Sequence, residues 1–109
     1  MMVDDPREYD QDLDILRTYN KISALDHTLV FVNHVLQYAY AHRLENNRVI
    51  STAIAEGRRA IRSYKNGVIY LQGLPVPPEN PREYMIKLSS LKEEFLDVTK
   101  NLQRLREKP

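Results

Sequence analysis

Residues 29–40 read Leu-Val-Phe-Val-Asn-His-Val-Leu-Gln-Tyr-Ala-Tyr, and only Asn33, His34 and Gln37 interrupt their apolar character. The stretch belongs to a longer helical pattern. A helix that is apolar around most of its circumference is expected to be covered on most sides. We therefore expect this stretch to lie at the centre of the fold, with the other helices packed around it.

A heptad pattern extends this first helix over residues 6–44. Its apolar positions form one seam: Ile15, Ile22, Leu25, Leu29, Val32, Leu36 and Ala39. Asp5 is the predicted capping residue, with Pro6 at the first helical position. An unbroken helix of this range would be about 58 Å long, so either its acidic first turns project beyond the bundle or it breaks within residues 20–26. We favour the continuous helix.

Two further helices are predicted, over residues 48–72 and 81–107. The third helix has a heptad seam that we expect to be core rather than an intermolecular coiled coil: Tyr84, Leu88, Leu91, Phe95, Val98, Leu102 and Leu105. For the second helix, Asn66-Gly67 makes a β-hairpin within residues 61–71 the alternative structure. We favour the helix. The 109 residues, 42% of them hydrophobic, thus predict an all-α fold, a three-helix up-down-up bundle with a long first helix, as one domain over residues 1–109.

The sequence lacks the motifs of common catalytic and metal sites. It contains no Cys, and it has no Glu-x-x-His pair, His-Glu-x-x-His motif, Gly-rich phosphate loop or Gly-x-Ser-x-Gly motif. His27 and His34 lie two turns apart and would need metal ligands from elsewhere. We expect no enzymatic activity, no cofactor and no metal site.

The N-terminal sequence lacks the basic and apolar regions of a signal peptide. The longest uninterrupted apolar run, residues 29–32, is too short to span a bilayer. These features predict a cytoplasmic protein with no membrane partner.

A second stripe on the first helix, away from the seam, is the most specific candidate binding surface. This His/aromatic stripe contains every histidine of the chain and consists of His27, Val30, Phe31, His34, Tyr38 and His42. Aromatic residues are enriched at protein interfaces, and a symmetric dimer would pair the stripe with itself. The alternative is that the stripe packs under a neighbouring helix. We predict that it binds a protein partner, namely a second copy of this chain.

The net charge of +1 is unevenly distributed. Residues 1–14 carry six carboxylates and one arginine, a net charge of −5, whereas residues 41–66 carry a net charge of +4. Within the second range, a basic patch of the kind that contacts phosphates is formed by Arg58, Arg59, Arg62 and Lys65. Our hypothesis is a small non-enzymatic helical interaction or assembly module that self-associates. The alternative is a nucleic-acid-binding accessory protein that uses the basic patch.

Overall fold

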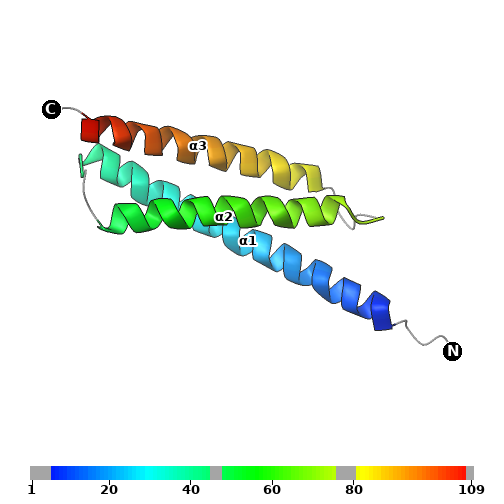
Figure 1. Ribbon diagram of the computed structural model, residues 1–109. Helices are drawn as coiled ribbons and strands as arrows, with labels where there is room; N and C mark the ends of the chain where they lie inside the picture. Colours follow the sequence, from blue (N-terminus) through cyan, green and yellow to red (C-terminus); the bar gives the residue numbers. More distant parts are fainter. Residues whose placement is uncertain (1–5, 45–47, 76–80, 108–109) are drawn as a thin grey trace.

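Three helices make up the described part of the chain. The computed structural model describes residues 6–44, 48–75 and 81–107, with side chains from residue 11 onwards in the first range. Helix α1 spans Pro6–Ala41, α2 spans Arg48–Gln72 and α3 spans Pro81–Glu107, and these ranges contain no strand. The helices run up, down and up (Figure 1), which confirms the predicted all-α bundle. The predicted capping residue Asp5 lies outside the described residues.

The helix boundaries settle two of the open alternatives. Helix α1 is unbroken, so it has no break within residues 20–26. Asn66 and Gly67 lie inside α2, so the hairpin alternative is wrong. The predicted ranges of α2 and α3 agree with the structure, whereas α1 ends at Ala41 rather than at residue 44.

The earlier end of α1 has a local cause. Arg43 adopts a left-handed backbone conformation with φ of 54°. This lets the Leu44 amide donate to the Ala39 carbonyl at 2.9 Å and the Arg43 amide donate to the Tyr40 carbonyl at 3.1 Å. These two hydrogen bonds form a Schellman motif, which closes a helix. Glycine usually occupies the left-handed position, so an arginine there does not indicate the end of a helix.

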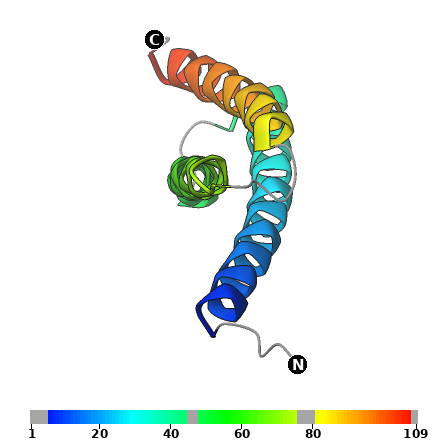
Figure 2. The ribbon, with the colours of Figure 1, turned by 90° about the vertical axis from the view of Figure 1, so that its right-hand side faces the viewer.

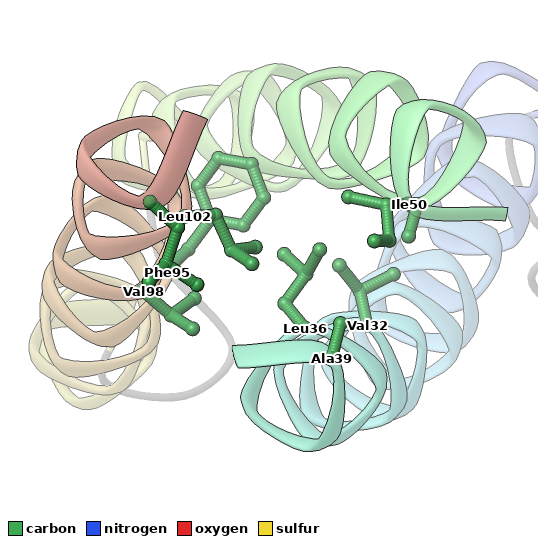
Figure 3. Close-up of a cluster of buried hydrophobic side chains, with 9 residues drawn as sticks. Val32, Leu36, Ala39, Ile50, Phe95, Val98 and Leu102 are labelled. Carbon is green, nitrogen blue, oxygen red and sulfur yellow. The ribbon is translucent and has the colours of Figure 1, made fainter. Parts of the chain in front are cut away.

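The seams of α1 and α3 meet buried residues of α2 in the core. Figure 3 shows one cluster, with Val32 and Leu36 from α1 facing Ile50 of α2 and Phe95 of α3. A second cluster lies towards the N-terminal half of α1: Ile22, Leu29, Ala60, Tyr64, Val68, Leu71, Leu88 and Leu91. The predicted seam of α3 is therefore core, as expected.

Helix α1 is covered on one side only, so the expectation that residues 29–40 are covered on most sides is wrong. Both other helices pack against the seam, and in Figure 2 the side of α1 that faces away from α2 has no neighbouring helix. Val30, Phe31 and Tyr38 are exposed on α1. The apolar residues of this stretch are divided between a buried seam and an exposed face, because a helix with two neighbours keeps part of its circumference in water.

The molecule is elongated. Its radius of gyration is 18.1 Å and its longest dimension is 73 Å, whereas a compact chain of this length has a radius of about 13 Å. Helix α1 is 36 residues long, against 25 for α2 and 27 for α3. Its N-terminal turns diverge from both other helices (Figures 1 and 2), so the acidic first turns project from the bundle.

Gly57 allows α2 to approach α3. A Cβ atom at Gly57 would lie 2.9 Å from Cδ2 and Cζ of the Phe95 ring, and closer still to Cε2. Phe95 is buried in the core, where side chains are closely packed. The absence of a side chain at Gly57 is therefore required by the packing of the Phe95 ring.

We expect Gly57→Ala to lower the free energy of unfolding by about 1–3 kcal/mol, because overpacking outweighs the gain of up to about 1 kcal/mol in helix propensity. Urea denaturation of the wild type and variant measures this. Gly73→Ala is the matched control, since a Cβ there would meet nothing nearer than the Ile69 carbonyl oxygen at 3.4 Å. Equal stability of the Gly57 variant and the control would contradict the packing described here.

Candidate interaction surfaces

Five residues of the His/aromatic stripe lie on the outward face of α1, and His42 follows directly after the last helical residue, Ala41. All six residues are exposed. Phe31 is 68% exposed and Tyr38 is 61% exposed. The Tyr38 and His42 rings contact each other, with centroids 4.1 Å apart. The alternative that the stripe packs under a neighbouring helix is therefore wrong, while its role in partner binding stays a prediction.

Polar side chains on one flank of α1 contact α3, and the His/aromatic stripe faces away from these contacts. The buried Asn33 donates from Nδ2 to the Leu91 carbonyl oxygen at 3.2 Å. One turn further along the chain, Gln37 hydrogen-bonds the Glu94 carboxylate. Near the middle of α1, Asp26 pairs with Lys87 of α3 at 3.0 Å. These contacts hold the rotation of α1, so the stripe faces away from the bundle.

A groove of about 380 Å³ between α1 and α2 adjoins the stripe. Its lining is mostly apolar and consists of Phe31, Val32, Val35, Arg48, Val49, Thr52, Ala53 and Glu56. The exposed Phe31 belongs to both the stripe and the groove. The contribution of α2 could not be predicted from the sequence, because Val49 is exposed and is not one of the buried residues of that helix.

The structure distributes the predicted basic patch over two sides of α2. Arg58 and Arg62 lie on the side that faces α3. Arg59 lines a depression shared with Leu25 and Thr28 of α1. Lys65 is exposed. Only Arg58 and Arg62 therefore share a concave surface.

That concave surface is a groove between α2 and α3, which we call the basic groove. Two adjoining hollows of about 550 Å³ and 310 Å³ share Arg58, Leu96 and Thr99. Helix α3 adds three cations that sequence reasoning missed, namely Lys92, Lys100 and Arg106. Among the described residues, no carboxylate lines either hollow, whereas Glu94 of α3 faces Gln37 of α1. The groove flank of α3 therefore carries cations, whereas its α1 flank carries both Glu94 and Lys87.

Metal-binding and membrane-spanning features are two other classes of candidate site. Within residues 6–44, 48–75 and 81–107, no three His, Asp or Glu side chains are grouped as the ligands of a metal ion. No helix in the described ranges has both the length and the apolar character needed to cross a membrane.

A buried polar cluster lies where α1, α2 and α3 meet. The Tyr64 hydroxyl is fully buried, and it has no hydrogen-bond partner among the described residues. Burial, followed by the charge of Asp26 and the nearby Tyr84, raises the pKa of Tyr64 to about 12 from its ordinary value of 10.0. The phenol therefore stays neutral inside the fold, where a phenolate would be poorly solvated.

Comparisons of this chain with protein-family models, with curated proteins and with solved structures give no match. The interaction surfaces therefore have to be interpreted from their own geometry and charge.

The raised pKa of Tyr64 predicts a loss of stability in alkaline solution. The stabilisation from the neutral phenol is fully present below pH 10 and is lost as the pH rises to about 12, because the unfolded chain releases the proton first. Tyr64→Phe should remove this part of the pH dependence. It should be neutral or slightly stabilising at pH 7, because the hydroxyl has no partner in the described structure.

Urea denaturation at pH 7 and pH 11 measures the difference between wild type and variant. Tyr70→Phe, at an exposed position of α2, is the matched control and should keep the alkaline loss of the wild type. The assignment to Tyr64 would be wrong if both variants lost stability to the same extent at pH 11.

Proposed function

We propose that this protein is a non-enzymatic helical interaction module that self-associates through the outward face of α1. The exposure of Phe31 and Tyr38 on one face of a well-packed helix carries this proposal. Large aromatic side chains that stay in water beside an apolar groove are typical of protein interfaces. A two-fold axis would place the same face of a second copy against it.

The free energy gained by burying the aromatic rings can be compared with the cost of forming a dimer. Phe31 and Tyr38 of two copies would each remove roughly 100 Å² from water, which contributes about 10 kcal/mol in total. Association costs about 4–15 kcal/mol in translational and rotational freedom. The rings alone roughly balance this cost, so a stable dimer needs further contacts along α1 or in the adjoining groove.

We expect Phe31→Ala combined with Tyr38→Ala to weaken the dimer about tenfold or more, because central aromatic residues dominate interface energies. Sedimentation equilibrium at pH 7.5 measures the dissociation constant, and circular dichroism checks the fold. The matched control is Ile69→Ala with Ile86→Ala, which are 50% and 61% exposed on α2 and α3. A dimer that is unchanged in the aromatic variant would place the interface elsewhere.

The basic groove supports a second candidate function, the binding of a polyanion such as nucleic acid. The supporting observation is the convergence of Arg58 and Arg62 with the three cations of α3, in a lining whose described residues include no carboxylate. Cations on two adjacent helices can follow a phosphate backbone and release its counterions. This candidate uses a different surface from the outward face of α1.

Replacing Arg58, Arg62 and Lys92 by Gln should weaken oligonucleotide binding at any sequence. The slope of log affinity against log salt should fall by about 2–3, since each phosphate contact contributes about 0.7–0.9. Fluorescence anisotropy at several salt concentrations measures both quantities. The control variant carries the same charge change outside the groove, with Gln at Arg17, Lys21 and Arg59. An equal loss of oligonucleotide affinity in the two variants would show that binding does not depend on the basic groove.

A further inference from the structure

The outward face of α1 extends well beyond the His/aromatic stripe. Leu16, which lies towards the N-terminal end, is 57% exposed on the same face. Asn20 and His27 continue this face at seven-residue spacing, and His34 lies a further seven residues along. A seven-residue spacing keeps side chains on one side of a helix over many turns. The exposed face from Leu16 to Tyr38 is therefore about 33 Å long.

The two ends of α1 carry opposite charge. Residues 6–14 contain four carboxylates against Arg7, a net charge of −3. Asp12 is exposed there, whereas Asp14 lies on the α2 side of α1, where it forms a surface ion pair with Arg17 at 3.9 Å and shares a hollow with Lys21 and Tyr70. At the other end, Arg43 is exposed just after α1 and Arg48 is exposed at the start of α2. A parallel pairing of two copies would place the acidic ends together, whereas an antiparallel pairing would place each acidic end near a basic end.

We propose that two copies of this chain pair their α1 helices antiparallel along this face. The inference rests on the self-association proposed above and adds the orientation of the second copy. The acidic first turns, which project from the bundle in Figure 1, then cover the region around Arg43 and Arg48 of the partner. The contact between the first turns and the partner supplies the further contacts that a stable dimer requires beyond the aromatic rings. The opposite charges favour the antiparallel orientation.

The exposed apolar residues locate the two-fold axis near His27. Leu16 and Tyr38 lie the same number of residues before and after His27, so this axis brings the Leu16 of each copy against the partner's Tyr38. By the same symmetry, Asn20 faces the partner's His34. His27 itself lies beside its counterpart in the second copy.

Cross-linking tests the orientation, and the chain contains no Cys that would give a background. Three single-cysteine variants are made at exposed positions, namely Asn20→Cys, His27→Cys and His34→Cys. Each is treated with a short bismaleimide alone, and Asn20→Cys is also treated after mixing with His34→Cys. Mass spectrometry identifies the linked species, and sedimentation of the unlinked protein reports whether a dimer forms.

The proposal predicts covalent dimers for His27→Cys alone and for the mixture, with at least a several-fold lower yield for Asn20→Cys or His34→Cys alone. Dimers from each of these two variants alone, with none specific to the mixture, would show parallel pairing and overturn the inference while self-association stands. A dimer in sedimentation without any of these links would place the interface elsewhere and overturn both proposals. A monomer at all concentrations would overturn the proposed self-association itself.

Discussion

The hydrogen bond from Asn33 Nδ2 to the Leu91 carbonyl oxygen, 3.2 Å long, fixes how α1 is rotated against α3. Asn33 is buried, and its Oδ1 atom has no partner among the described residues. An unpaired buried oxygen costs about 1–3 kcal/mol, which an apolar residue at this position would avoid. In coiled coils, a buried Asn fixes register at a similar cost in stability. Asn33 lies beside the seam of α1 rather than in it, and its contact is to the α3 backbone.

The rotation of α1 determines both the core and the surface. With Asn33 directed at α3, the seam that contains Leu29 and Leu36 faces the bundle and is fully buried. Phe31 and Tyr38 then necessarily face water on the other side. A small rotation would bury one of these rings and expose a seam residue instead. The interaction face is therefore a direct consequence of how the core is packed.

The heptad spacings predicted the three helices and nearly all of the core, because a seam with period 3.5 has only one face to bury. They also grouped the His/aromatic stripe correctly on one face of α1. The coverage of residues 29–40 was mispredicted, because Phe31 and Leu36 have similar hydrophobicity. Which of the two is buried depends on where the two neighbouring helices pack against α1. The basic groove was missed for a related reason. Lys92 and Arg58 line the same groove because of the side on which α3 packs against α2. The residue spacing within a single helix does not encode the handedness of the bundle.

The central claim is that the outward face of α1 is open in the monomer and covered in the dimer. His27 and His34 lie on this face, and His42 follows directly after α1. The rate of carbethoxylation of each histidine, followed residue by residue with mass spectrometry, reports the accessibility of the face directly. Our account predicts that His27, His34 and His42 all react at low protein concentration. It also predicts that His27 and His34 become protected as the mass doubles. Histidines that are unreactive in the dilute monomer, or equally reactive in monomer and dimer, would contradict it.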